Sequence, residues 1–392
     1  MPDNLILPDN ELVNKFFEKY KLEFYYSKPV LKHIKEFMLA ATSKGFSAKT
    51  TDIAEYSSNH RTTIGHFLSN GAWKEEYLQQ IIRDTSLNFT FNHSKDTSEP
   101  LFIIHDDTIC QKTKPSSQAK SPIEDASFHR SNKYGHQLLA TMINCGEYTL
   151  INDLQRYNKK KQSKIDAVME IAESMPVPPN KAYALFDSWY NCPKIINAYA
   201  KQGYHCIGGL KTNRIIYPQG IRIGISNFVD KYVHKSDVHL VTVNNSEYWI
   251  YRYEGPLNDI ENAVVILTWP KGSFKKPKSL KAFLSTDVSL NTVTILEYYS
   301  KRWPIEIFFR QEKLNLGLDK YQIRSIKGIE RIWTLQSLVH LFCTIGLDKP
   351  MKFGEGLLKA RKQSKKEYVA WIYEQAQSEV PIDIVLEILN IA

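Results

Sequence analysis

The sequence has few cysteines and no long apolar run, and both absences restrict the class of protein. Its five cysteines are odd in number, form no CxxC pair and lie in no Cys/His cluster at zinc-ligand spacing, so we expect reduced, mostly structural thiols. No apolar stretch approaches the roughly 20 residues that cross a bilayer, which argues against a membrane protein. The acidic N-terminal segment has neither a basic start nor a cleavage site, and a cytoplasmic location is therefore expected.

The composition is typical of a globular protein that is larger than one ordinary domain. With 392 residues, of which 43% are hydrophobic, the chain can bury a sizeable core, and two or three structural units are expected. The formal net charge of +9 favours a polyanionic partner, although a basic balance also occurs in proteins that bind no nucleic acid. The charge is therefore supporting evidence only.

Residues 1–95 are predicted to form a helical DNA-binding domain. The stretch TTDIAEYSSNHRTTIGHFLSN resembles a helix-turn-helix, with a first helix from about Thr51 to Tyr56 and a second that reaches Leu68. The side chains left to face DNA in this arrangement are His60, Arg61, Thr62 and His66. An ordinary helical hairpin has the same spacing and stays an alternative.

From residue 99 the pattern changes to short apolar runs, which predict an α/β unit. Strands are expected at 101–105, from residue 136, at 148–154, at 182–186 and at 205–211, with helices near 164–173 and 195–200. This order is that of the ribonuclease-H-like fold. Alternating apolar and polar positions then predict an all-β insertion, and helices follow from about residue 291. The expected division is 1–95, a catalytic core of 96–214 and 276–345, the insertion 215–275, and a helical C-terminal region 346–392.

Two predicted strands are followed directly by acidic residues. Asp106 and Asp107 follow one strand, and Asp187 follows another. Acids at these positions lie where the carboxyl ends of strands open into a ligand crevice. For either strand taken alone, an aspartate that only caps the following loop or helix is an equally good explanation.

The stretch YSKRWPIEIFFRQEK spaces Tyr299, Arg302, Glu306 and Lys313 at offsets of three, seven and fourteen residues. At about 100° per residue, an unbroken helix would carry all four within an arc of roughly 60°. A carboxylate flanked by two cations and a phenol suits a hard metal ion beside phosphates, whereas the alternative is a solvated charged face. Pro304 predicts a kink or a restart, beyond which Glu306 and Lys313 should still share a face.

This stretch resembles the Y-x2-R-x3-E-x6-K signature of cut-and-paste transposases of insertion sequence family four and its relatives, and every signature position matches. The resemblance extends to HDDT around Asp106, to FDSWY around Asp187 and to GGLKTNR beyond it, and covers about residues 99–345. It implies a ribonuclease-H-like (retroviral-integrase-like) core with a β-strand insertion before the last acid, and a homodimer on DNA.

The resemblance also implies the site. Asp106, Asp187 and Glu306 would be the catalytic ligands of two Mg²⁺ ions, with Mn²⁺ as a substitute. Asp107 is the alternative first acid, although the family pattern of Asp, one residue, then Thr or Ser fits Asp106-Asp107-Thr108. The residues implied to bind DNA phosphates are Tyr299, Arg302, Lys313, Lys211 and Arg214.

The implied function is cleavage and strand transfer of an insertion sequence, with its terminal inverted repeats and target DNA as double-stranded partners and a nucleoid-associated location. Two alternatives stay open: an inactive DNA-binding protein derived from a transposase, and a ribonuclease-H-like nuclease. In one respect the sequence departs from the family, because Lys281 stands where hairpin-forming relatives carry a base-stacking tryptophan, and Trp269 is a distant substitute. The cleavage chemistry is therefore left open.

Overall fold

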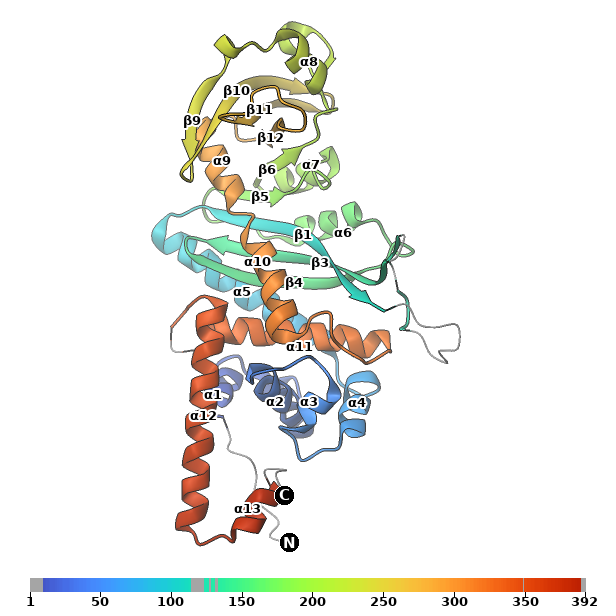
Figure 1. Ribbon diagram of the computed structural model, residues 1–392, viewed down its shortest axis with the longest axis vertical. Coiled ribbons are helices and arrows are strands. Elements are labelled where there is room, and N and C mark those ends of the chain that lie inside the picture. The colour runs from blue at the N-terminus through green and yellow to red at the C-terminus, as the bar shows by residue number, and fades with distance from the viewer. Residues whose placement is uncertain (1–9, 114–122, 127, 131–132, 348, 389–392) are drawn as a thin grey trace.

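The structure is a computed structural model that describes residues 10–113, 123–126, 128–130, 133–347 and 349–388. Figure 1 shows an elongated molecule in which a twisted sheet fills the middle and one end, and helices fill the other end. Across the described ranges, none of the helices has the combination of length and apolar character needed to span a membrane.

One half of the sheet has four antiparallel strands, of which one is short, followed by two strands parallel to β1 (Leu101–Lys112). β3 (Lys133–Cys145) pairs antiparallel with β1, with β4 (Tyr148–Tyr157) and with the short β2 (Phe128–Arg130). β5 (Ala182–Phe186) lies parallel to β1, and β6 (His205–Leu210) lies parallel to β5. With α6 (Lys164–Ser174) and α7 (Pro193–Lys201), the predicted order of strands and helices is confirmed, and β2 is added to it.

The other half of the sheet continues from β6 through strands that are all antiparallel. The order is β12 (Lys281–Ser285), β11 (Ile260–Pro270) and β10 (Ser246–Leu257), then β7 (Ile215–Ile216) and β8 (Ile223–Gly224), with β9 (His239–Val243) also on β10. The expectation of an all-β segment at 215–275 is wrong, because the segment also contains α8 (Ile225–Tyr232) and two short turns, η2 (Pro218–Gly220) and η3 (Lys235–Asp237). Apolar residues at helical spacing, Ile225, Phe228 and Val229, bury one face of α8.

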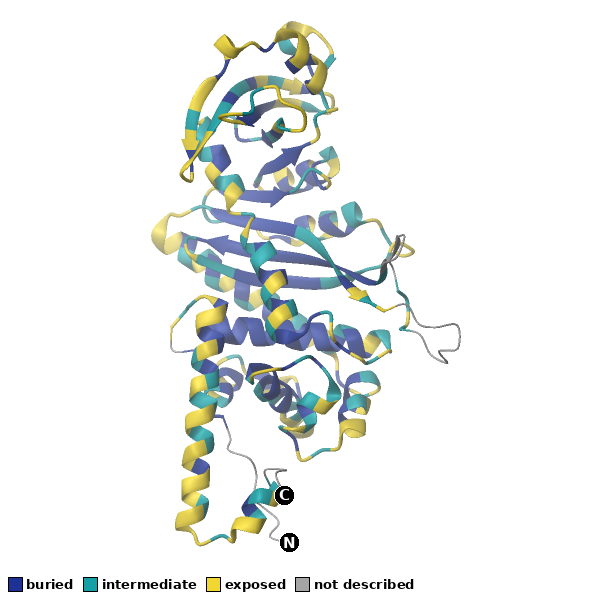
Figure 2. Cartoon of the chain, in the orientation of Figure 1, coloured by how far each residue is buried: buried dark blue, intermediate teal, exposed yellow. Residues whose placement is uncertain are grey.

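The helices that cover the opposite face of the sheet from α6 and α7 are α9 (Thr292–Ser300), α10 (Pro304–Gln311), the π-helical turn η4 (Glu312–Leu316) and α11 (Ile326–Ile345). The predicted signature lies in the first three of these and in the turn between α9 and α10. From Gly328 to Ile345 every residue of α11 except Glu330 is buried, because α11 lies between the sheet and the N-terminal helices (Figure 2).

The N-terminal helices form a layer on the far side of α11 (Figure 1). They are α1 (Glu11–Lys19), η1 (Leu22–Phe24), α2 (Lys28–Thr42), α3 (Thr50–Ala54) and α4 (Arg61–Ser69), and α5 (Glu75–Thr97) continues from them to the sheet. The long α12 (Phe353–Gln377) and the short α13 (Ile382–Ile388) complete the chain.

A buried arginine joins this helical layer to α11. Arg331 has no exposed surface and forms an ion pair of 2.9 Å with Glu75. Its guanidinium also donates to the backbone carbonyls of Phe67, Leu68, Gly71 and Trp73. Because helix ends leave carbonyls without intrahelical partners, Arg331 satisfies the end of α4 and fixes it on α11.

Candidate active site

The strand register brings the first two predicted acids together. β1 and β5 pair in parallel, and the last pair is Ile104 opposite Leu185. Asp106 and Asp187 each lie two residues beyond this pair. Neighbouring strands lie about 4.8 Å apart, so the extended register places the two aspartates side by side where β5 ends. The expectation that the first strand stops at residue 105 is wrong, since β3 pairs with β1 over all twelve residues of β1.

The alternation of side chains along β1 assigns its two aspartates to opposite faces of the sheet. Phe102 and Ile104 belong to the core cluster that includes α9, α10 and α11, whereas Leu101 and Ile103 belong to the cluster that includes α6 and α7. By the same alternation, Asp106 lies on the face covered by α10 and Asp107 lies on the face covered by α6.

Arg302 connects Asp106 to the third predicted acid. Its Nη1 donates to Asp106 Oδ2 at 2.7 Å, and its Nη2 donates to Glu306 Oε1. The two carboxylates are therefore separated by one guanidinium group and two hydrogen bonds. Among the residues that the structure describes, the three acids do not form a group whose ligand atoms all lie within 4.8 Å of one another. The guanidinium lies between two of the groups that would have to approach a common ion.

The electrostatics of Asp106 reflect burial and neighbouring charge. Burial raises the pKa of Asp106 to about 6, against the lowering effects of Arg302 and of a hydrogen bond from the Asp107 N–H, and the charges of Asp187 and Asp107 raise it further. Asp187 Oδ1 accepts the backbone N–H groups of Trp189 at 2.8 Å and Tyr190 at 3.3 Å. Three carboxylates form an oxygen donor set that fits a hard divalent cation.

Asp107 is already occupied by other partners. Its Oδ1 accepts a hydrogen bond of 2.8 Å from Lys164 and one of 2.7 Å from the Tyr190 hydroxyl, and its Oδ2 accepts from Gln137. The arrangement therefore favours Asp106 over Asp107 as the first acid of a metal site. Sequence reasoning did not identify Lys164 or Gln137, which lie 57 and 30 residues from Asp107 in no recognisable motif.

The four signature residues do not lie on one unbroken helix, as the restart predicted at Pro304 requires. α9 ends at Ser300 and α10 begins at Pro304. Lys313 lies beyond the end of α10, in η4. Proline at the first turn of a helix cannot continue the preceding one. The break nevertheless leaves the residues around β1: Arg302 contacts Asp106, and Lys313 donates to Thr108 Oγ1 at 2.8 Å and to the Ile109 carbonyl at 3.1 Å.

Tyr299 lies at the same opening of the sheet. A Cβ added at Gly209, on β6, would be 3.4 Å from the Tyr299 hydroxyl. Burial raises the pKa of Tyr299, Arg302 lowers it, and the charges of Asp187 and Asp106 add to the rise. The phenol is therefore within electrostatic range of both aspartates.

Of the remaining residues predicted to bind DNA, two follow β6 and four lie at α4. Lys211 is exposed after β6, and Arg214 is half-buried with an Nη2 atom that has no hydrogen-bond partner among the described residues. The four residues predicted to face DNA from the helix-turn-helix are all exposed: His60, Arg61, Thr62 and His66. They lie at α4, which α11 separates from the sheet (Figure 1).

The tryptophan named as a distant substitute for the base-stacking residue is not accessible, whereas two other tryptophans are. Trp269 is fully buried in β11 beside Phe274, at 5.1 Å between ring centroids, so it cannot stack on a nucleobase. Two others are exposed close to predicted acids in the sequence: Trp189 at 46%, two residues after Asp187, and Trp303 at 57%, three residues before Glu306. Both could have been noticed in the sequence, because Trp189 lies in the FDSWY motif and Trp303 lies between Arg302 and Glu306 of the signature.

Comparison with known proteins gives a family and similar solved structures. The family model described as transposase DDE domain matches residues 97–342. Among solved structures, a synaptic complex of piggyBac transposase with hairpin DNA superposes with a TM-score of 0.43 and 10% sequence identity, over 96% of this chain and 80% of that chain. No curated protein matches the sequence.

Proposed function

Because the chain belongs to the transposase DDE domain family, we propose that it is a DNA transposase that cleaves and joins DNA at a site formed by Asp106, Asp187 and Glu306. The observation that supports this proposal is the bridge that Arg302 forms between Asp106 and Glu306, together with the strand register that brings Asp187 beside Asp106. The acids would hold two Mg²⁺ ions, or Mn²⁺ in their place. Such ions, when bound, activate a water or a 3′-hydroxyl and stabilise the leaving oxygen.

The basic and phenolic side chains around the acids would position the DNA backbone. Arg302 donates to one oxygen of each of two carboxylates in the free protein, and an incoming phosphate offers two acceptor oxygens on a single group. Tyr299 and Lys313 border the same opening of the sheet, and Lys211 and Arg214 follow β6. Phosphate contacts of this kind fix the register of a duplex without reading its sequence.

The two exposed tryptophans would contact bases rather than phosphates. Trp189 and Trp303 present large apolar surfaces to solvent next to Asp187 and Glu306 in the chain. Aromatic side chains that stack on unpaired bases contribute about 1–3 kcal/mol per base. This placement suits DNA whose end is distorted or single-stranded at the point of cleavage.

We further propose that the catalytic core is ribonuclease-H-like and belongs with insertion sequence family four. The strand order β4-β3-β1-β5-β6, with three antiparallel strands and then two parallel ones, supports the fold. In the proposed division, residues 96–214 and 276–345 form the core, 215–275 the insertion, and 346–392 the C-terminal region. The partners would be the terminal inverted repeats and target DNA, bound by a homodimer in a cut-and-paste reaction.

Residues 1–95 would bind the element's ends through α3 and α4. Ile53, Ile64, Phe67 and Leu68 are buried, which leaves the opposite face of α4 exposed with His60, whose ring accepts the Thr62 N–H. A short helix pair whose second helix begins with exposed polar residues suits insertion into a major groove.

The test is cleavage of duplex DNA that carries the element's ends, in Mg²⁺, by Glu306→Ala and Asp106→Asn proteins. Both substitutions should abolish strand cleavage and leave end binding largely intact, because each removes a metal ligand without removing a phosphate contact. Glu297→Ala is the matched control, since Glu297 is exposed on α9 and lies outside the site. Cleavage by Glu306→Ala at the wild-type rate would overturn the assignment.

A second assay separates a transposase from a ribonuclease-H-like nuclease. With pre-cleaved ends and a target plasmid, a transposase joins the 3′ ends to the target, whereas a nuclease only degrades or nicks. Joined products that depend on Glu306 are the expected result, and nicking alone would favour the nuclease.

A further inference from the structure

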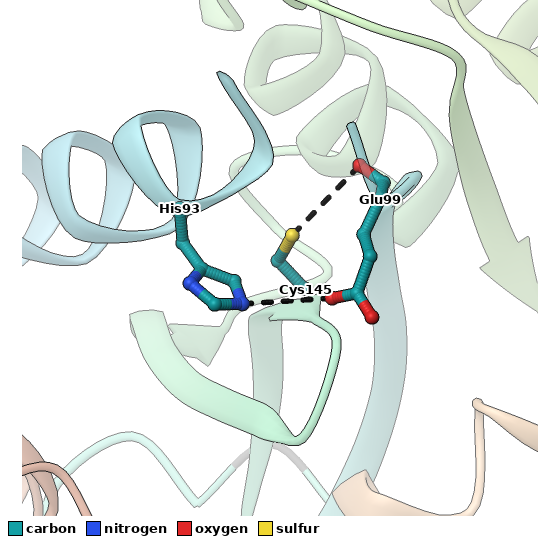
Figure 3. A group of neighbouring side chains, drawn as sticks. All are labelled: His93, Glu99 and Cys145. Carbon is teal, nitrogen blue, oxygen red and sulfur yellow. Dashed lines mark hydrogen bonds and ion pairs between the residues drawn. The ribbon is translucent and has the colours of Figure 1, made fainter. Parts of the chain in front are cut away.

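A cluster of three different metal-binding side chains lies at the end of the sheet away from the acids (Figure 3). His93 projects from the last turns of α5, Glu99 lies in the connection from α5 to β1, and Cys145 is the last residue of β3. Cys145 pairs with Leu101 at the start of β1, so the cluster is roughly 17 Å along the strand from Asp106. It is a second site, independent of the proposed catalytic one.

The geometry of the cluster is close to that of a tetrahedral zinc site. One ligand atom from each of the three residues lies within 4.8 Å of the others, and His93 Nε2 is 3.5 Å from Glu99 Oε2. Zinc binds nitrogen and oxygen at about 2.0–2.2 Å and sulfur at about 2.3 Å, which places tetrahedral ligand atoms roughly 3.3–3.6 Å apart. The nitrogen and oxygen already have this separation, and the Cys145 sulfur lies within 4.8 Å of a ligand atom of each of the other two residues.

The donor types select a different ion from the one proposed for the acids. A thiol sulfur, an imidazole nitrogen and a carboxylate oxygen suit zinc, whereas Mg²⁺ prefers an all-oxygen set. We propose that His93, Glu99 and Cys145 bind a zinc ion, with a fourth position open to water.

The backbone at residue 146 lies directly against two of the ligand atoms. Gly146 has φ +59°, and a Cβ added there would lie 2.2 Å from Glu99 Oε2 and 3.2 Å from His93 Nε2. A side chain at this position would therefore fill the region that the two ligand atoms face. Ser94 Oγ donates to the Glu99 carbonyl at 2.7 Å, which fixes the connection from which the carboxylate extends. The cluster is thus held by its surroundings, and glycine at position 146 keeps a side chain out of the region that the ligand atoms share.

The position of the cluster indicates a structural role. His93 belongs to the helix that leads from the N-terminal layer, whereas Cys145 belongs to the sheet. An ion bound to both would cross-link α5 to β3 next to the start of β1. Because a preformed site does not exist in the unfolded chain, the binding free energy would add to the stability of this junction.

Cobalt(II) is the most direct probe, because a cobalt–thiolate bond gives a charge-transfer absorption that oxygen and nitrogen ligands do not give. Metal-free full-length protein should bind one Co²⁺ with this absorption, and an equimolar amount of Zn²⁺ should remove it. Cys145→Ser should eliminate the absorption, whereas Cys192→Ser, at a half-buried cysteine in another part of the chain, should retain it. The absence of a thiolate absorption in the wild-type protein would overturn the proposal, as would its persistence in Cys145→Ser.

Zinc affinity gives a second measurement that does not disturb a buried residue. Glu99 is exposed, and Glu99→Gln should fold normally while it weakens Zn²⁺ binding by about tenfold or more. The wild-type melting temperature should rise on addition of Zn²⁺, and the rise should be smaller in Glu99→Gln. Equal zinc affinity in the two proteins would refute the site. Glu306→Ala should leave every one of these results unchanged, so failure here does not count against the transposase proposal.

Discussion

Replacing Arg302 by alanine should strengthen Mn²⁺ binding to the catalytic carboxylates of the DNA-free protein. The guanidinium donates to Asp106 at 2.7 Å and also to Glu306, so an ion that uses these oxygens must displace it. A hydrogen bond to a charged group contributes about 1.5–3 kcal/mol. The Glu306 side chain is 36% exposed, so solvent reduces the free energy that its hydrogen bond to Arg302 contributes. Taking about 2 kcal/mol for both bonds, the Mn²⁺ dissociation constant should fall about 30-fold.

Calorimetry or electron paramagnetic resonance of free Mn²⁺ would measure this change in the full-length protein. Glu306→Ala gives the background from ions bound elsewhere. Arg310→Ala is the charge-matched control, because Arg310 is exposed on α10, the helix that carries Glu306, and its loss changes the net charge equally. If Arg302→Ala binds Mn²⁺ no more tightly than Arg310→Ala does, then Arg302 does not compete with the ion and the reasoning fails.

The same bridge predicts coupling between DNA and metal. If a DNA phosphate takes over Arg302, duplex ends should increase the Mn²⁺ affinity of the wild-type protein, and by linkage Mn²⁺ should increase its affinity for DNA by the same factor. The increase should be smaller in Arg302→Ala, in which no guanidinium has to move. An equal increase in both proteins would mean that the phosphates reach the site without engaging Arg302.

Three further substitutions have distinct expected results. Asp107→Asn should lower the melting temperature more than Asp106→Asn, because only Asp107 is bound by three side-chain donors on the α6 face; the reverse order in thermal unfolding would contradict this. Arg331→Met should cost about 3–5 kcal/mol, since it leaves buried carbonyls and a carboxylate unpaired, and an unchanged urea midpoint would refute the role of Arg331. Burial raises the pKa of Asp287, but hydrogen bonds from Ser289 and Tyr183 outweigh it and hold the pKa at about 2. Asp287 therefore stabilises the fold above about pH 4 and loses this effect as the pH falls towards 2, so the melting temperatures of wild type and Asp287→Asn should differ at neutral pH and converge at pH 2.

Local patterns in the sequence determined the order of the elements. The apolar run AYALF is buried at every position and forms β5 as predicted, because a strand covered on both faces needs no polar alternation. Pro304 separates two helices because its ring has no N–H donor and disfavours helical conformation at the preceding residue. Both effects are local and can be predicted from the sequence.

Contacts distant in sequence decided the site itself. The full length of β1, and hence the position of Asp106 within it, depends on pairing with β3 over twelve residues. Two adjacent aspartates have almost the same sequence neighbourhood, and only the face of the sheet separates Asp106, bonded to Arg302 196 residues later, from Asp107, bonded to Lys164. His93, Glu99 and Cys145 have no zinc-like spacing and meet only where α5 and β3 converge. Periodicity and proline geometry act between near neighbours in the chain and can be predicted from it, whereas strand register and side-chain bridges depend on which distant segments pack together.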